Sequence, residues 1–556
     1  MWPKSFVNQP GVGMSRPNPV VLFGFLVSIL ALLGGLAVLK GGLFIAKHEA
    51  DTLHLVQIVF RMNAGEWPHL DFMTPLGVLA YAPIAFFTWL GAGIGHAILY
   101  AQIAVGSLLL PLAWWAGISR FSRGLAYLFG GLVMVLCVAI AFGTTEQTIS
   151  ISMHYNRWAW AISFVAIALA VVPPLGRARP LVDGSIIGLC LAALALIKVT
   201  YFIAFAPAIA LGLVFRKDWR AMGWALIAGL LVVAVVTFVA GVEFWLAYVK
   251  DLLQVARSDV RPQPGLLFSR VLLESAYLGA TLVATLGAVL YRQSKEDAAG
   301  YALLVLLPGF AYVTYQNYGN DPQWLPLLAI LFLAMRPAQP QPNRWGWDIR
   351  KGMEIAAIAI FAMAAPSYIN MATSPIRQMT FDTDKYEPIL MQGGLNGDLQ
   401  VPIIRARRVD ATTSLDVESS GLEGIQEGAD REDMGTLFGE PLPYCALSLG
   451  LPGWTKAIVT DLERAGFANG KRLFIADMFS SHWLFGNLKP LIHGAPWYYG
   501  GLPGFDSADY VLVPLCPAVA KARKQILDDI SERDDVTLKE IRRTSLYILL
   551  DIERRN

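Results

Sequence analysis

The sequence predicts a multi-span α-helical integral membrane protein that ends in a small extracytoplasmic α/β domain. Three observations carry this prediction: the composition, a long series of apolar runs, and a change to polar sequence in the last third. Of the 556 residues, 55% are hydrophobic and only 15% are charged, whereas soluble domains carry about 25% charged residues. The net charge of +2 is too close to zero to indicate a nucleic-acid partner.

Apolar runs follow one another from residue 20 to residue 367. The first run, residues 20–39, has about the 20 residues that a spanning helix needs. No small-residue cleavage site follows it, so we expect a retained span rather than a removed signal peptide. The other runs cover residues 75–95, 97–118, 124–142, 158–174, 181–197, 199–215, 221–241, 267–291, 299–315, 322–335 and 352–367.

Basic residues between these runs indicate how many of them cross the membrane. The clusters are Arg120 with Arg123, Arg177 with Arg179, Arg216 with Lys217 and Arg220, Arg292 with Lys295, and Arg336 to Lys351. Basic loops stay in the cytoplasm, and with the N-terminus inside all five clusters reach that side only if residues 75–95 do not cross. We therefore predict eleven spans, with residues 75–95 as a juxtamembrane or re-entrant element. A true span combined with a weaker charge rule is the alternative.

The chain changes character after residue 367, which predicts a membrane domain at 1–367 and an extracytoplasmic α/β domain at 368–556. Strands are expected at 471–477, 508–516 and 544–552, and a helix at 516–535. Cys445 and Cys516 have no metal-binding spacing. They could pair if this domain lies outside the cytoplasm.

Unusual polar chemistry follows the first span, in the predicted first external loop at residues 47–96. Glu49 and Asp51 project from the same side of an extended segment. A helical pattern then begins, with an apolar stripe of Leu53, Val56 and Phe60 and a polar face of His54, Gln57 and Arg61. This pattern predicts an amphipathic helix at the membrane surface. Asp51 is then either a helix N-cap or an acid that accepts a proton or binds a metal.

Basic residues on the predicted outer face are exceptions to the charge rule. Those that could meet an anionic ligand are Arg157 and Lys198, while Arg257, Arg261 and Arg270 add further positive charge. An unpaired charge near the bilayer centre costs about 3 kcal/mol, so Arg157 and Lys198 should have an anionic partner there. A lipid-linked phosphate would suit such a set of cations. Snorkelling of the side chain to the surface is the alternative for Lys198.

Polar residues of the outer loops complete the predicted site. The loops 143–157 and 316–321 converge on the same face under the eleven-span topology, and Asp71 lies in the first loop. His154 could equally be a hydrogen-bonded loop residue, and Asp321 a helix cap. The predicted acceptor and sugar pocket comprises Asp71, Glu146, His154, Tyr155, Asn156, Asn317 and Asp321.

The first external loop, "HEADTLHLVQIVFRMNAGEWPHLDFMTPLG", resembles the corresponding loop of the C-type (GT-C) membrane glycosyltransferases. The similarity is greatest to the bacterial branch of protein-mannosyltransferase-like and RgtA-to-D-like enzymes. His69 stands where that branch usually has a tyrosine. "ALIKVTYF" is similar to a second family segment, whose lysine matches Lys198. The loop pattern is met by Asp51, Leu55, Gly65, Glu66, Pro68, Asp71, Phe72 and Pro75.

The resemblance implies an enzyme of the bacterial cytoplasmic membrane that works on its outer face. Such an enzyme moves a sugar from a polyprenyl-phosphate donor to a hydroxyl of a lipid, glycan or protein acceptor. Asp51, beside Glu49, would be the general base. Arg157 and Lys198, with support from Arg257 and Arg261, would stabilise the donor phosphate.

Two points stay open at the level of sequence. Many relatives carry an aspartate in the second external loop, but "MHYNRW" has none, which leaves a divalent cation possible and no cofactor certain. A transporter or lipid flippase, or an assembly factor with an external binding domain, is the non-enzymatic alternative. We see no internal repeat of the kind that transporters show, and the acids lie in loops rather than inside spans.

Overall fold

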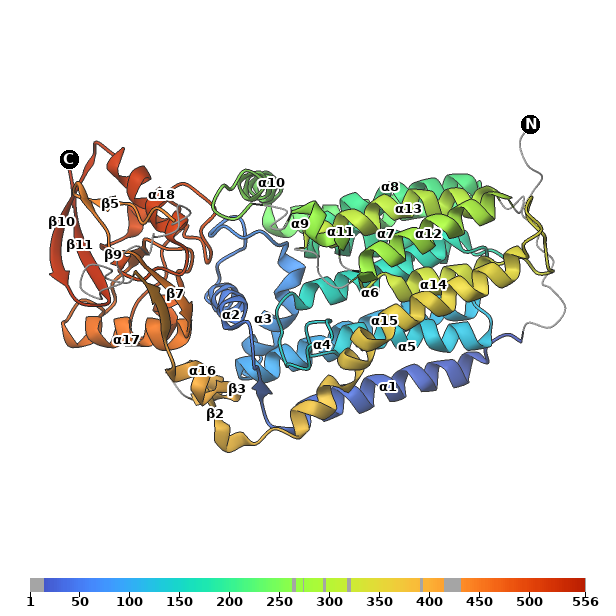
Figure 1. Cartoon of the computed structure of the whole chain (residues 1–556), viewed down its shortest axis with the longest axis horizontal. Helices are drawn as coiled ribbons and strands as arrows, with labels where there is room; N and C mark the ends of the chain where they lie inside the picture. The colour runs from blue at the N-terminus through green and yellow to red at the C-terminus, as the bar shows by residue number, and fades with distance from the viewer. Residues whose placement is uncertain are drawn as a thin grey trace, which may run out of the picture.

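The computed structural model describes residues 15–262, 267–273, 275–293, 297–317, 322–390, 394–414 and 432–555. Long, roughly parallel helices form a bundle, and a strand-containing C-terminal region covers one end of it (Figure 1). The long helices of the bundle are α1 (Pro19–Leu39), α4 (Ile94–Arg120), α5 (Arg123–Val138), α6 (His154–Val171), α7 (Pro180–Ile197), α8 (Val199–Phe215), α9 (Trp219–Ala240), α12 (Ser275–Gln293), α13 (Asp297–Gln316), α14 (Leu325–Met335) and α15 (Ile349–Met379).

Five described helices, α1, α4, α7, α9 and α15, are long and apolar enough to cross a membrane. Helices α5, α8 and α14 are apolar but shorter. These helices indicate a membrane protein, as the composition predicted. The count of eleven spans and their orientation stay predictions.

The segment 75–95 forms no long helix. It contains a short 3₁₀ turn at Val78–Ala80 and the eight-residue helix α3 (Ala82–Trp89) before α4 begins. At 1.5 Å per residue, α3 is about 12 Å long, whereas the hydrocarbon core is about 30 Å thick. The segment is therefore not a spanning helix, in agreement with the sequence-based prediction.

Loops that carry the predicted cytoplasmic charges lie together at the end of the bundle remote from the C-terminal region (Figure 1). Hydrogen bonds join several of them: the amide of Arg123 donates to the carbonyl of Ser15 at 2.9 Å, and that of Leu175 to the carbonyl of Ser119 at 2.9 Å. Arg16 also donates to the carbonyl of Leu175. The described residues of the basic clusters thus share one end of the molecule, which is the arrangement expected if residues 75–95 do not cross the membrane.

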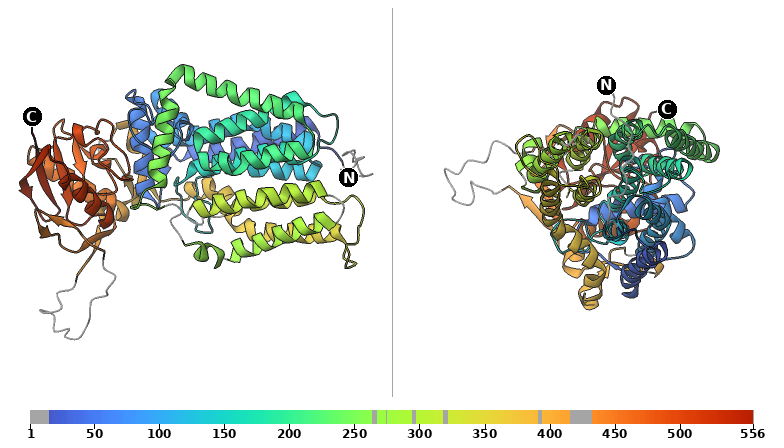
Figure 2. Two further views of the ribbon diagram at one scale, coloured as in Figure 1. Left: turned by 90° about the horizontal axis from the view of Figure 1, so that it is seen from above. Right: turned by 90° about the vertical axis from the view of Figure 1, so that its right-hand side faces the viewer.

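Two helices cross the other end of the bundle, α2 (Glu49–Asn63) and α10 (Glu243–Ala256). Figure 1 shows them nearly end-on and Figure 2 from the side, lying between the bundle and the C-terminal region. The short helix α11 (Phe268–Leu273) follows α10 in the chain.

The amphipathic prediction for α2 is wrong in one respect, because its polar face is not in water. Gln57 accepts a hydrogen bond from the indole of Trp483 at 3.0 Å, and Arg61 donates to the carbonyl of Leu491 at 2.7 Å. The C-terminal region therefore covers the face that the sequence pattern assigned to solvent.

The C-terminal region is built around a four-stranded sheet in the order β10-β11-β9-β8, with β8 and β9 parallel and the other pairs antiparallel. The predicted strands at 471–477, 508–516 and 544–552 and the predicted helix at 516–535 are all present. The elements of the region are β2 (Tyr386–Pro388), β3 (Leu399–Pro402), α16 (Ile403–Arg407), β4 (Asp410–Thr413), β5 (Thr436–Leu437), β6 (Glu440–Pro441), β7 (Cys445–Leu449), α17 (Leu451–Arg464), β8 (Leu473–Ile475), β9 (Tyr510–Pro514), α18 (Ala520–Ser531), β10 (Val536–Arg543) and β11 (Tyr547–Arg554).

A disulfide joins Cys445 of β7 to Cys516, just after β9. Strand β7 pairs with β4 outside the main sheet. The bond therefore ties this two-stranded ladder to the main sheet, and the pairing left open by the sequence is present.

The boundary predicted at residue 367 falls inside α15, which continues to Met379. The boundary was placed where the sequence becomes polar, but polar side chains of α15 form hydrogen bonds with the loop before α6 and the helix continues. Ser367 donates to the carbonyl of Gly143, and Asn370 donates to the carbonyl of Glu146 at 2.9 Å. Strand β1 (Leu43–Phe44), between α1 and α2, pairs in parallel with β3, so the segment before α2 and the C-terminal region share a sheet.

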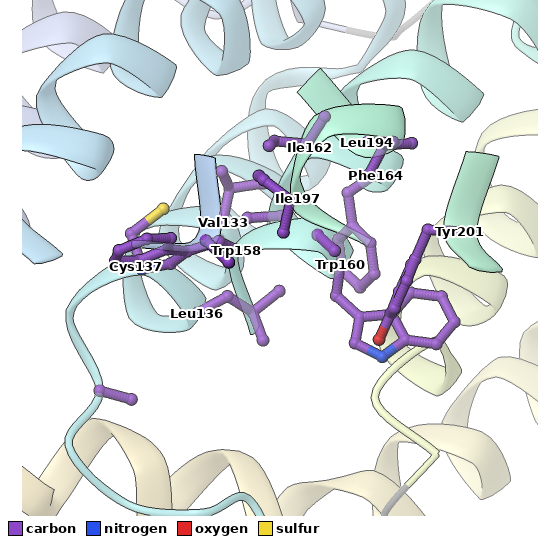
Figure 3. Close-up of a cluster of buried hydrophobic side chains, with 14 of the residues drawn as sticks. Val133, Leu136, Cys137, Trp158, Trp160, Ile162, Phe164, Leu194, Ile197 and Tyr201 are labelled. Atoms are coloured by element: carbon purple, nitrogen blue, oxygen red, sulfur yellow. The ribbon is translucent and has the colours of Figure 1, made fainter. Parts of the chain in front are cut away.

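Aromatic side chains of α6 belong to a buried hydrophobic cluster inside the bundle (Figure 3). The rings of Trp160 and Tyr201 lie 5.1 Å apart, and those of Trp160 and Phe205 lie 5.5 Å apart. This packing fixes the start of α6 against the start of α8. The two helix starts carry several of the predicted site residues.

Candidate active site

A cavity of about 560 Å³ lies between the bundle, α2, α10 and a loop of the C-terminal region. It collects residues from segments far apart in the sequence. Its polar and aromatic lining includes Asp51, His54, Tyr81, His154, Tyr155, Lys198, Arg261, Gln316, Asn317, Trp497 and Tyr499. Six of the residues predicted from the sequence are thus brought together: Asp51, His154, Tyr155, Lys198, Arg261 and Asn317.

Asp51 lies in the first turn of α2 and lines this cavity. A carboxylate near a helix N-terminus is stabilised by the helix dipole. Its Oδ2 accepts a hydrogen bond from the hydroxyl of Ser152. The N-cap of the helix is His48, in the left-handed conformation. The alternative in which Asp51 is the N-cap is therefore wrong.

Lys198 interrupts the chain between α7 and α8, with an extended backbone and its side chain at the cavity. Its ammonium donates to the amide oxygens of Asn317 and, at 3.4 Å, Asn156. It also lies 5.5 Å from the centre of the Tyr155 ring. Within the described ranges its partners are neutral, so Lys198 is held in place without a counter-charge.

Arg261 reaches the same cavity from the segment after α10. Its guanidinium lies 3.8 Å from the centre of the Trp497 ring, a cation–π contact. The other predicted cation of this segment, Arg257, does not line this cavity. Arg257 is exposed and lines a second cavity on the far side of α10.

The structure does not bring Arg157 to the cavity. It lies on α6 three residues after His154, which at 1.5 Å per residue is about 4.5 Å deeper in the bundle. Its side chain is buried, with an exposed fraction of 1%. None of its three guanidinium nitrogens has a hydrogen-bond partner among the described residues. The sequence could place Arg157 at the start of this helix but not on its inner side.

Three predicted carboxylates form contacts elsewhere and do not line the cavity. Glu49 forms an ion pair with Arg405 of α16. Glu146 pairs with Lys47 at 2.7 Å. Asp71 accepts a hydrogen bond from the amide of Trp67 at 2.6 Å, which closes a turn. Among described residues the cavity thus has one aspartate, Asp51, while Asp321 lies outside the described residues.

His154 and Asn156 each form a hydrogen bond with another segment of the chain. The Nε2 of His154 is 2.9 Å from the carbonyl oxygen of Ala80, which joins α6 to the segment before α3. Asn156 does not line the cavity itself, although its amide oxygen contacts Lys198. His154 therefore lines the cavity with its ring nitrogen in a hydrogen bond, which agrees with the alternative that it is a hydrogen-bonded residue rather than a ligand.

His54, Trp497 and Tyr499 line the cavity but were not among the predicted site residues. The rings of His54 and Trp497 are 4.3 Å apart. Burial, reinforced by the positive charge of Arg261, lowers the pKa of His54 to about 3, so this imidazole is neutral at pH 7. Its Nε2 has no hydrogen-bond partner among the described residues. The aromatic run "PWYYGG" at 496–501 could have indicated Trp497 and Tyr499 as binding residues. Because this run is far from the first loop in sequence, its position beside that loop could not be predicted.

Within the described ranges no group of three His, Cys, Asp or Glu side chains is placed to hold a metal ion. A divalent cation therefore stays a possibility raised by the sequence. The arrangement that is present consists of Asp51, Lys198, Arg261 and the neutral imidazole of His54 around a partly apolar space.

No model of a known protein family matches the chain. A search of curated proteins also finds no match. The resemblance to the C-type glycosyltransferases therefore depends on the sequence segments quoted above.

Proposed function

We propose that the protein is a membrane glycosyltransferase that moves a sugar from a polyprenyl-phosphate donor to an acceptor hydroxyl on the outer face of the cytoplasmic membrane. One observation carries this proposal: Asp51, Lys198 and Arg261 line one cavity. A base for the hydroxyl and cations for the phosphate are the two requirements of such a transfer.

The walls of the cavity suit a donor with a lipid tail. Val199, Ile203, Leu252 and Val255 supply apolar lining. Ile203 of α8 is also 56% exposed on the outside of the bundle. A prenyl chain can therefore lie against α8 in the lipid while its phosphate reaches Lys198.

The chemistry follows from the positions of the charges. Asp51 takes the proton of the acceptor hydroxyl as its oxygen bonds to the anomeric carbon of the sugar. The bond from that carbon to the phosphate oxygen breaks, and both its electrons leave with the lipid phosphate. Lys198 and Arg261 offset the negative charge that grows on this phosphate, most effectively where water is excluded.

Orientation is supported by two features. The Cys445–Cys516 disulfide is of a kind that persists in oxidising compartments outside the cytoplasm. The predicted cytoplasmic charges lie at the opposite end of the bundle (Figure 1). Both features favour an orientation in which the cavity and the C-terminal region face the periplasm or outside, and the bacterial cytoplasmic membrane is what the resemblance implies.

The test is transfer by the purified protein in lipid vesicles, with a polyprenyl-phosphate donor carrying a radiolabelled sugar and an extract of the bacterial envelope as acceptor. Asp51→Asn keeps an oxygen that accepts from Ser152 but cannot take a proton. We expect transfer to fall by about 10²–10⁴-fold.

Asp348→Asn is the matched control, because Asp348 caps α15 through the amide of Arg350 and Asn caps a helix equally well. Transfer by this variant should equal that of the original protein. Undiminished transfer by Asp51→Asn would exclude Asp51 as the base and remove the main support for the proposal.

A further inference from the structure

A second cavity, also of about 560 Å³, lies on the far side of α10 from the candidate active site. One wall is α10, and the other is the C-terminal region around residues 499–501. Val249, Leu253 and Tyr499 line both cavities. The two spaces are therefore separated by a wall that is one side chain thick.

The α10 wall combines an apolar surface with positive charge. Leu246, Val249 and Leu253 are 69%, 53% and 48% exposed, respectively. Lys250 and Arg257 are exposed beside them. Neither cation has an ion-pair partner in the part of the chain that the structure describes, although the exposed Asp259 also lines this cavity.

The direction of α10 gives this surface a place at the membrane. The helix lies across the bundle axis, as Figures 1 and 2 show from two sides. If the bundle crosses the membrane, α10 lies in the plane of the outer surface. Helices with an apolar face and basic residues in that plane bind anionic lipids.

The wall opposite α10 is polar and lies within hydrogen-bond distance of α10. Gly500 and Gly501 leave their backbone open, and Gln525 adds an amide. The carbonyl of Gly500 accepts a hydrogen bond from Gln254 of α10 at 2.8 Å, which joins the two walls. Amide, hydroxyl and backbone groups of this kind hydrogen-bond to the hydroxyls of a polar head group.

We propose that this second cavity binds the head group of an anionic membrane lipid and that this lipid is the acceptor of the transfer. Lys250 and Arg257 hold its phosphate, and the leucine and valine side chains of α10 contact its chains. Its hydroxyl-bearing part faces Tyr499, which lines both cavities, and this hydroxyl reaches Asp51 in the first cavity only when the Tyr499 side chain moves aside. The acceptor role rests on the proposed function, whereas the lipid site does not.

The site itself is tested by photo-crosslinking, independently of any transfer. Phosphatidylglycerol with a diazirine in its head-group region is added to phosphatidylcholine vesicles that hold the full chain. Labelled peptides are then quantified by mass spectrometry. We expect labelling of α10 and of residues 495–525 at least fivefold above that by an equivalent phosphatidylcholine probe.

Lys250→Gln with Arg257→Gln should reduce this labelling to the phosphatidylcholine level. Lys217→Gln with Arg220→Gln, at the other end of the bundle, is the matched control and should not change it. Asp51→Asn should also label normally, because binding precedes chemistry. Equal labelling by both probes, or no loss in the Lys250 and Arg257 double variant, overturns the lipid site.

The acceptor role is tested by the fate of the radiolabelled sugar. With phosphatidylglycerol vesicles and donor, we expect label in a product that extracts into organic solvent. In the Lys250 and Arg257 double variant, the KM for phosphatidylglycerol should rise about tenfold or more with little change in kcat. Label recovered only in water-soluble glycan or in protein overturns the acceptor role. Complete absence of transfer to any acceptor refutes the proposed function, while the crosslinking result would still stand.

Discussion

Two fully buried arginines, one in the bundle and one in the C-terminal region, have opposite surroundings. Arg523 of α18 donates to the carbonyls of Met434, Pro514 and Leu515 at 2.8 to 3.2 Å. Arg157 of α6 is equally buried and has no hydrogen-bond partner among the described residues. The first guanidinium connects elements of one domain. The second makes no such bond to any described residue.

The same difference extends to the lysines. Lys471 in the C-terminal region pairs with Asp509 at 3.0 Å, whereas Lys198 has only amide partners within the described ranges. Lys198 at the candidate active site thus has no counter-charge among the described residues, whereas Lys471 in the C-terminal region has one. The contrast indicates where an anionic ligand belongs.

Replacing the two arginines should separate their roles most strongly. Arg523→Met leaves buried carbonyls without donors, and we expect the free energy of unfolding of the C-terminal region to fall by about 3–5 kcal/mol. Arg157→Met removes a buried charge without a partner, so the bundle should keep or gain stability. Hydrogen exchange of α18 and α6 amides measures both effects. Equal losses in the two variants would end the comparison.

pH should affect the C-terminal region through Asp477. Burial raises the pKa of this carboxyl to about 6, above its value of about 3.9 in an unfolded chain. The folded state therefore holds the proton more tightly, and stability from this group falls as pH rises from about 4 to 6, by roughly 3 kcal/mol in total.

Asp477→Asn should abolish that pH dependence, because an amide does not titrate. Hydrogen exchange of the β9 and β11 amides between pH 4 and pH 7, corrected for the intrinsic exchange rate at each pH, measures this dependence of stability on pH. A profile that has the same slope in both proteins would assign the effect to another group.

Lys198→Ala should weaken use of the donor without unfolding the bundle. A hydrogen bond to a charged group contributes about 1.5–3 kcal/mol, which corresponds to a rise in the KM for donor of about 10–150-fold. Lys471→Ala is the control, since its ion pair is at the surface and contributes less than about 1 kcal/mol. An unchanged KM in the Lys198 variant would mean that this lysine only positions Asn156 and Asn317 and does not bind the donor.

The smallest effect is expected at Glu49. Its ion pair with Arg405 fastens α2 to the C-terminal region and is partly exposed, so Glu49→Gln should destabilise that contact by about 1 kcal/mol. Transfer should change by no more than a few-fold. A loss as large as that of Asp51→Asn would restore the catalytic role that the sequence predicted for Glu49.

Much of the architecture was predictable from the sequence because apolar runs and loop charges are strong, local signals. The exclusion of residues 75–95 from the spanning helices and three strands of the C-terminal sheet followed from such signals. The end of α15 did not, because Ser367 and Asn370 bond to loop carbonyls, and a polar residue with a buried partner cannot be distinguished in sequence from one in water.

The candidate site was half predictable for a related reason. Asp51 and Lys198 could be found, because a charge beside an apolar run is conspicuous on its own. The structural contacts of Glu49 and Glu146 depend on partners 356 and 99 residues away. The contribution of Trp497 to the cavity lining likewise depends on tertiary packing that no local sequence pattern encodes.

The pairing of β1 with β3, together with the covering of α2, has a consequence for biosynthesis. Helix α2 is made among the first residues of the chain, yet the segments that pack over it are among the last to leave the ribosome. The protein must therefore insert its helices first and assemble its cavity only when translation is nearly complete. A nascent chain that stalls before the final sheet would be a membrane-embedded bundle with no finished site.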